Sequence, residues 1–156
     1  AIIKDQSYPE YITLIAKVRV DSWTGGDDNC RAGVGLRTRT TVGTKREGYN
    51  LLFHENTSTL QFLNDLSTWG PSVTFNWNTD TWYWFKFKVE NTGSATHLYG
   101  KVWQDGTSEP DSWNIDSVWN GGFSRDPPTY VYPSIHGGYG CGTTVSFDDV
   151  QVCGAS

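Results

Sequence analysis

The sequence predicts an all-β domain: a two-sheet antiparallel β-sandwich of the jelly-roll kind. Apolar side chains recur at every second position through most of the chain, as they do in strands with one buried face. The chain has 17 Gly, 8 Trp, 8 Tyr and no Met, a composition that favours strands and turns over helices. No stretch keeps apolar residues at i, i+3, i+4 and i+7 over three turns, so no long helix is expected.

The segment 11–20 shows this alternation most clearly. One of its faces carries Ile12, Leu14, Ala16, Val18 and Val20. Seven further segments alternate similarly and are separated by breaks rich in Gly, Asn, Asp, Thr and Pro. They are 32–40, 48–54, 59–64, 81–90, 95–104, 130–136 and 144–152. The stretch 113–128 lacks a clear strand and is expected to be a packed loop, so the sequence predicts one sandwich domain over residues 1–156.

Charge and hydropathy exclude several classes of partner. The 156 residues carry a net charge of −5 with acids and bases interspersed, whereas a nucleic-acid-binding protein needs a clustered basic surface. No apolar run approaches the roughly 20 residues that cross a bilayer, so no membrane association is expected. Ala1 leads directly into sequence typical of a folded domain, which predicts a mature or excised part of a longer secreted protein with neighbouring domains.

Five segments, in this order along the chain, carry a family pattern. They are Ala-Gly-Val-Gly-Leu-Arg at 32–37, Gly-Tyr-Asn-Leu at 48–51, the Trp-led strand at 81–89, Lys-Val-Trp-Gln-Asp-Gly at 101–106 and Phe-Asp-Asp-Val-Gln-Val at 147–152. Together they resemble the concanavalin A-like lectin/glucanase superfamily, in particular its laminin-G-like branch. The resemblance spans roughly residues 10–152, but the usual opening strand is not found before 2–4. It implies a jelly roll, a fold that hosts lectins, carbohydrate-binding modules, glycosidases, lyases and adhesion domains.

The predicted outer faces of the central strands combine aromatic and basic side chains. A pyranose ring stacks its C–H face on an indole or phenol, and its hydroxyls hydrogen-bond to basic and amide groups. The sequence therefore predicts a polysaccharide-binding face on one side of the sheets. Its residues are Arg37, Arg39, Tyr49, Trp84, Lys86, Tyr99, Lys101, Trp103, Tyr132 and His136. Alternatively, these aromatic and basic groups pack on one another as cation–π pairs.

The predicted function is that of a non-catalytic carbohydrate-binding module, which tethers an enzyme to its polymer. A retaining glycosidase needs two carboxyls about 5 Å apart, and no strand supplies such a pair. A polysaccharide lyase is an alternative, with Tyr99, His136, Arg37 and Lys101 as residues of the right types. An extracellular adhesion or structural assembly domain is another. The basic residues leave an acidic polymer open, whereas the Trp content favours a neutral glucan or xylan.

Asp148 and Asp149 suggest a structural Ca²⁺ site. Phe147 and Val150 are three residues apart and cannot both point inward on a regular strand, so the sequence predicts a β-bulge between them. In jelly-roll sugar-binding modules a similar Asp often holds Ca²⁺, a cation that prefers oxygen ligands. Possible co-ligands are Asp5, Asp27 and Asp28. The alternative is a solvated acidic pair on an edge strand.

The three cysteines, Cys30, Cys141 and Cys153, leave at least one unpaired. The resemblance places the strand 11–20 beside the closing strand 144–152, which would bring the loop with Cys30 near the loop with Cys141. The resemblance therefore favours a Cys30–Cys141 disulfide, because Cys153 would lie at the far end of the closing strand. Three reduced cysteines are the alternative. A disulfide would fit an extracellular location.

Overall fold

The computed structural model describes residues 1–3, 12–26, 30–38, 48–64, 68–92, 95–119, 132–137 and 141–154. Ten strands lie within these ranges, and no helix there is long and apolar enough to cross a membrane. The strands are β1 (Ile12–Ser22), β2 (Arg31–Thr38), β3 (Tyr49–His54), β4 (Thr59–Asn64), β5 (Thr68–Thr74), β6 (Trp82–Thr92), β7 (Ala95–Gln104), β8 (Ile115–Trp119), β9 (Tyr132–His136) and β10 (Thr144–Gly154).

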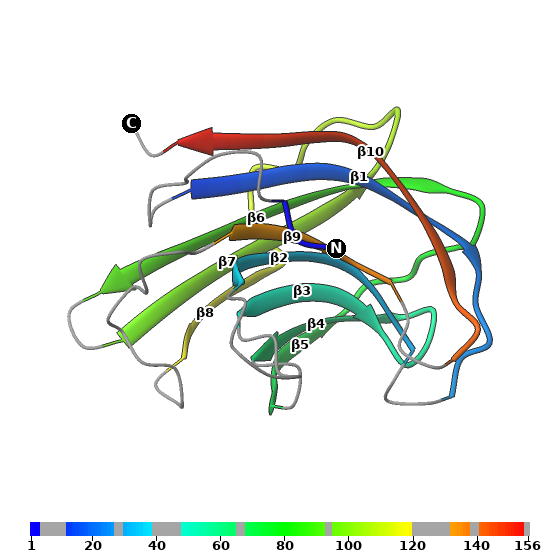
Figure 1. Cartoon of the computed structure of the whole chain (residues 1–156), viewed down its shortest axis with the longest axis horizontal. Coiled ribbons are helices and arrows are strands. Elements are labelled where there is room, and N and C mark those ends of the chain that lie inside the picture. The colour runs from blue at the N-terminus through cyan, green and yellow to red at the C-terminus, as the bar shows by residue number, and fades with distance from the viewer. Residues whose placement is uncertain are drawn as a thin grey trace.

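The strands form two antiparallel five-stranded sheets, so the predicted β-sandwich is confirmed. One sheet, here called the β6 sheet, has the order β10-β1-β6-β7-β8. The other, the β3 sheet, has the order β5-β4-β3-β2-β9. Figure 1 shows the β3 sheet running from β9 and β2 to β5, with β10 and β1 along the far edge of the β6 sheet. The two sheets leave β5, β8, β9 and β10 as edge strands.

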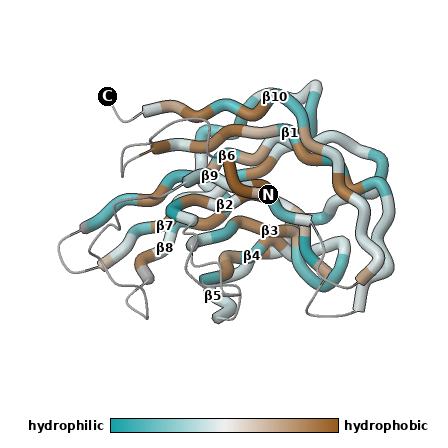
Figure 2. Tube along the Cα trace, viewed as in Figure 1, coloured by the Kyte–Doolittle hydropathy of each residue, from teal (hydrophilic) through white to brown (hydrophobic). Residues whose placement is uncertain are grey.

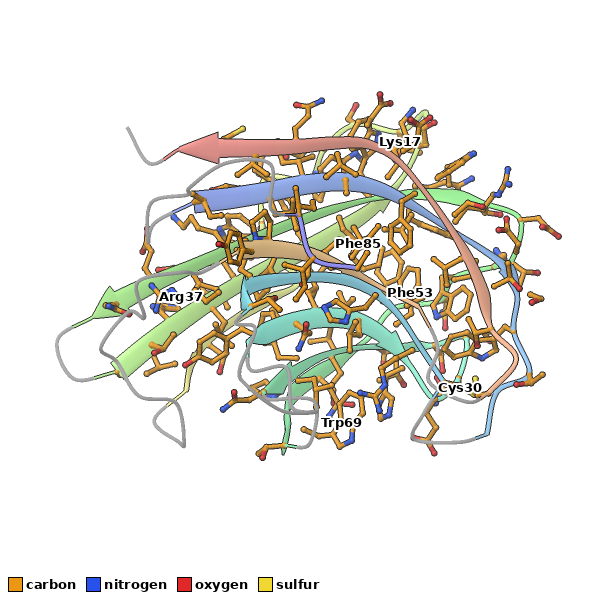
Figure 3. The ribbon with its side chains drawn as sticks, in the orientation of Figure 1. Lys17, Cys30, Arg37, Phe53, Trp69 and Phe85 are labelled. Atoms are coloured by element: carbon orange, nitrogen blue, oxygen red, sulfur yellow. A yellow bond between two sulfur atoms is a disulfide. The ribbon has the colours of Figure 1, made fainter. Side chains whose placement is uncertain are left out.

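The hydrophobic core lies between the two sheets. In β1 the side chains of Ile12, Leu14, Ala16, Val18 and Val20 are all buried, as the alternation predicts. Phe53 of β3 and Phe85 of β6 meet across the core, edge to face, with ring centroids 4.8 Å apart. Figure 3 shows these two rings pointing toward each other between the sheets, and Figure 2 shows hydrophobic segments along the strands of both. This packing leaves each sheet a second, outer face.

Two strands were not expected from the sequence. β8 begins inside the segment predicted to be a packed loop and pairs with β7, from Thr96–Trp119 to Gly100–Ile115. β5 contains Gly70 and Pro71 and lies at the edge of the β3 sheet. Pro is tolerated at an edge, where its missing N–H need not join a ladder. Both are edge strands: β8 has only five residues and its apolar positions do not alternate, and β5 is interrupted by Gly and Pro, so neither stands out from loops.

The predicted bulge and disulfide are both confirmed. Between the Ile15–Gln151 and Lys17–Asp148 pairs, one residue of β1 faces two residues of β10, and Asp149 has a φ of 47°. β1 and β10 are antiparallel neighbours, as the resemblance implied. Cys30 and Cys141 form a disulfide with Cα atoms 5.4 Å apart, and Cys153 is free and exposed.

Candidate functional site

The outer face of the β6 sheet carries an indole pair. Trp84 of β6 is the cross-strand partner of Trp103 of β7, and both are partly exposed. Their ring centroids are 6.2 Å apart and the planes differ by 18°. Opposite β-strand partners project to the same face, and the register therefore sets the two rings side by side. The result is a stacked pair of nearly parallel indoles across two strands.

The Trp84 ring is fixed by its neighbours. Its Nε1 donates a hydrogen bond to Asp105 Oδ1 at 2.9 Å. Lys17 of β1 is paired with Trp84, and its Nζ lies 5.0 Å from the centre of a Trp84 ring. The same Nζ is 3.3 Å from Asp105 Oδ2 and 3.2 Å from Asp149 Oδ2. Hydrogen bonds to Asp149 and Asp105 raise the pKa of Lys17, so this ammonium stays charged.

The next row of the face contains two lysines that share one carboxylate. Lys86 and Lys101 are cross-strand partners, and Glu109 Oε1 lies 3.0 Å from Lys86 Nζ and 3.7 Å from Lys101 Nζ. Lys101 Nζ also donates to the Pro110 carbonyl at 2.7 Å and lies 4.9 Å from the Trp113 ring centre. The hydrogen bond from Lys86, with the charges of both lysines, lowers the pKa of Glu109. The chain after β7 therefore folds back over this face.

The third row is built around Tyr99. Its ring stacks on His97 at a centroid distance of 4.1 Å, and Lys88 Nζ lies 4.6 Å from its centre. Lys88 is paired with Glu90 at 2.8 Å, and His97 Nε2 contacts Asp116 Oδ1. Burial, followed by the charge of Glu90, raises the pKa of Tyr99, so its hydroxyl stays protonated at neutral pH. Each aromatic ring of this row therefore has a charged or ring partner.

The outer face of the β3 sheet has a different character. At Gly35 an added Cβ would lie 2.3 Å from Ser134 Oγ and 2.6 Å from Asn50 Oδ1. It would also lie 2.8 Å from His136 Nε2. Ser134 Oγ is in turn 2.8 Å from His136 Nε2 and 2.7 Å from Thr38 Oγ1. Only glycine leaves room for this hydrogen-bonded chain, which lies directly on the backbone of β2.

A stacked cluster adjoins this chain on the same face. Trp69 of β5 lies flat on His54 of β3, with centroids 3.4 Å apart and planes 18° from parallel. The guanidinium of Arg31 lies 5.2 Å from the centre of a Trp69 ring. His54 Nδ1 is 2.8 Å from Gln61 Oε1. His54 and Arg31 are buried, so this face offers little of its polar surface to a ligand.

Two predicted ligand-binding residues lie inside the sandwich, and their assignment to an outer face was wrong. Arg37 is 5% exposed, and its Nη1 donates to Asn91 Oδ1 of the opposite sheet at 2.8 Å. Its φ of 52° interrupts the alternation of β2 and redirects the side chain. Tyr49 is 2% exposed, and its hydroxyl donates to Thr96 Oγ1 at 3.3 Å. Figure 3 shows Arg37 at one end of the layer between the sheets. Arg39 lies outside the described residues.

The remaining predicted residues divide between the two outer faces. Trp84, Lys86, Tyr99, Lys101 and Trp103 share the outer face of the β6 sheet, as predicted, but Lys101 is buried there at 6% exposure. His136 and Tyr132 belong to β9 of the β3 sheet, on the opposite side of the molecule. The prediction of a single face was therefore wrong, and the residues suggested for a lyase are not brought together.

The sequence reasoning missed the residues that complete the β6 face. Asp105, Glu109 and Trp113 come from the segment after β7, which sequence patterns predict only as a turn. The signal available was the Asp105-Gly106 pair, a turn sequence that reverses the chain. It indicates a reversal but does not indicate which side chains return to the sheet.

One of the two predicted calcium ligands, Asp149, is paired with a lysine. Asp149 is paired with Lys17 at 3.2 Å, an ammonium ion in a place where Ca²⁺ would need oxygen ligands. No group of three or more His, Cys, Asp or Glu suited to a metal occurs within the described ranges. Asp5, Asp27 and Asp28 lie outside them. A Ca²⁺ site at Asp148 and Asp149 therefore stays a prediction, and at Asp149 the ion would have to displace the Lys17 ammonium.

Comparisons with known proteins bear on the fold alone. No family model matches the chain, and no curated protein matches it. A solved structure of a functionally unknown protein from Saccharomyces cerevisiae is similar, with a TM-score of 0.57 and 11% sequence identity. The match covers 97% of this chain and 73% of that one. At this identity the similarity supports the sandwich architecture and says nothing of a ligand.

Proposed function

We propose that the chain is a non-catalytic, polysaccharide-binding module and that the outer face of the β6 sheet is its binding surface. The observation that carries this proposal is the Trp84–Trp103 pair, with two partly exposed indoles within 18° of parallel. The exposed part of each indole offers apolar ring surface on which the C–H face of a sugar ring can stack. The earlier resemblance to concanavalin A-like carbohydrate-binding modules agrees with this proposal.

The contacts that hold the Trp84 ring support binding rather than argue against it. Packing of Lys17 and Asp105 against Trp84 fixes the ring before a ligand arrives. A preorganised surface loses less conformational entropy on binding than a mobile one. Cation–π packing, which was the alternative explanation of these residues, therefore also serves to position the rings.

A module of this kind acts by raising the local concentration of an attached enzyme at its polymer, so it needs no catalytic group. We propose an extracellular location for it. The Cys30–Cys141 disulfide supports an oxidising compartment, because such bridges persist mainly outside the cytosol.

Affinity gel electrophoresis against a panel of soluble polysaccharides tests the proposal. We expect retardation by at least one polymer, weakened about tenfold or less by Trp84→Ala or Trp103→Ala, since a stacking contact contributes about 0.5–1.5 kcal/mol. The matched control is Trp69→Ala, which removes a partly exposed indole from the opposite outer face.

Each outcome of this comparison is informative. Loss of retardation in Trp69→Ala with retention in Trp84→Ala would move the site to the β3 sheet and overturn the proposal. Absence of retardation by every polymer would overturn it as well. Formation of unsaturated uronate, followed by its ultraviolet absorbance, would replace the binding module by a lyase.

A further inference from the structure

The cations of the β6 outer face are all neutralised by carboxylates of the chain itself. Five Lys and Arg side chains of the described residues lie on this face, and each is within 4.0 Å of a carboxylate. The pairs are Lys17 with Asp105 and Asp149, Arg19 with Asp21, Lys86 and Lys101 with Glu109, and Lys88 with Glu90. These five cations face five carboxylates, and Asp116, beside His97, adds a sixth. The face is aromatic and polar but has no net positive charge.

We propose that this face selects neutral polysaccharides over uronate-containing ones, and that Glu109 is the residue that sets the selection. This inference rests on the binding function proposed above and goes further by naming the class of polymer. A polyanion would bring its carboxylates beside six others and would have to displace those already held by the lysines. Both effects oppose the binding of a polyanion. Its carboxylates would be repelled by those of the face, and each lysine would have to give up an existing ion pair.

Glu109 has the central position in this arrangement. It joins Lys86 and Lys101, which lie between the Trp84–Trp103 pair and Tyr99 in the register of β6 and β7. These lysines are the basic groups closest to the middle of the aromatic surface. Their charge is compensated by Glu109. Lys101 is buried and donates to the Pro110 carbonyl, whereas Lys86 is partly exposed and its ammonium group, with three N–H donors, can still donate to a hydroxyl. Lys86 is thereby suited to a sugar hydroxyl rather than to a uronate carboxylate.

The carboxylates themselves suit a neutral ligand. Asp105, Glu109 and Asp149 are each more than a third exposed at the side chain. An ionised carboxylate only accepts hydrogen bonds, and the hydroxyls of a neutral sugar supply donors for it. The polar ring around the indoles therefore complements a polymer that is rich in hydroxyls and carries no charge.

Matched polymers and one substitution test this inference. We compare hydroxyethyl cellulose with carboxymethyl cellulose, and arabinoxylan with glucuronoxylan, by affinity electrophoresis at low ionic strength. In whichever of the two pairs the wild type binds, we expect it to bind the neutral polymer at least about tenfold more tightly than the acidic one. Glu109→Gln keeps the side-chain size but removes the negative charge that compensates Lys86 and Lys101. We expect it to reduce this preference at least about threefold, with the gain on the acidic polymer lost in high salt.

The control is Glu55→Gln, which makes the same charge change at an exposed turn between β3 and β4. It should leave the preference at the wild-type value. Equal or tighter wild-type binding of the acidic polymers would overturn the selection and leave the binding function standing. An unchanged preference in Glu109→Gln, with an unchanged melting temperature, would overturn the role of Glu109. Binding of none of the polymers in any panel would overturn the binding function itself.

Discussion

The two outer faces of this sandwich have the same strand geometry but differ in how far their outward-pointing side chains are exposed. On the β6 sheet, Trp84, Lys86 and Lys88 are partly exposed and lie in rows of rings and ion pairs. On the β3 sheet, the outer positions Asn50 and Leu52 are 2% and 0% exposed. The chain of Thr38, Ser134 and His136 over Gly35 is hydrogen-bonded at close range, whereas Asn50 Oδ1 is buried with no hydrogen-bond partner among the described residues.

This difference shows what alternation in a sequence can reveal. Where one face of a strand is exposed, hydrophobic and polar residues alternate, and the pattern gives the direction of each side chain. Where both faces are buried, the outer positions carry apolar or hydrogen-bonded residues, and alternation loses its meaning. In β2 and β3 every described position is buried, so a basic or aromatic side chain there indicates structure as readily as binding.

The largest expected effect on stability comes from removing the disulfide that links the two sheets. The Cys30–Cys141 bridge joins the start of β2 to the segment before β10, and its two cysteines are 111 positions apart in the sequence. Replacing both cysteines by Ala should lower the free energy of unfolding by about 2–5 kcal/mol, because a loop of this length restricts the unfolded chain strongly. Denaturant unfolding measures this loss. Cys153→Ala, which removes the free and exposed thiol, should leave stability unchanged. An equal loss in Cys153→Ala would contradict the pairing.

The next effect compares equivalent outer positions of the two sheets. Leu52 on the β3 sheet is 0% exposed, and Leu52→Ala should cost about 2–5 kcal/mol through the cavity that it leaves. Ile15 lies on the outer face of the β6 sheet and is partly exposed. Ile15→Ala removes less buried surface and should cost less than about half as much. Urea denaturation of both variants checks the comparison, and equal costs would mean that the two faces are buried alike.

The sequence predicts the sandwich because its inner positions alternate over long strands such as β1. It predicts the aromatic face of β6 and β7 for the same reason, since the outer side chains there are partly exposed. It fails at Tyr49, where β3 is buried on both faces, and at Arg37, where a left-handed residue interrupts the alternation. It cannot predict Glu109, whose place over Lys86 and Lys101 depends on the path of a loop in three dimensions.

The smallest expected effect is the acid sensitivity that the ion pairs of the β6 face confer. The hydrogen bond from Ser146, ahead of that from Arg19, lowers the pKa of Asp21, and those from Lys88 and Lys86 lower the pKa values of Glu90 and Glu109. A carboxyl with a lowered pKa in the folded state stabilises the fold above its ordinary pKa of about 4. That stabilisation is lost as pH falls through the lowered value.

The contribution of these three carboxyls to the melting temperature should therefore be constant from pH 7 to about pH 5 and decline below about pH 4. The decline should be shallow, because exposed ion pairs each contribute little. Thermal melts of the wild type and of the triple variant Asp21→Asn/Glu90→Gln/Glu109→Gln measure this contribution. The variant should melt lower at pH 7, and its difference from the wild type should shrink on acidification. A difference that is constant with pH would mean that these carboxyls stabilise the fold through packing rather than through charge.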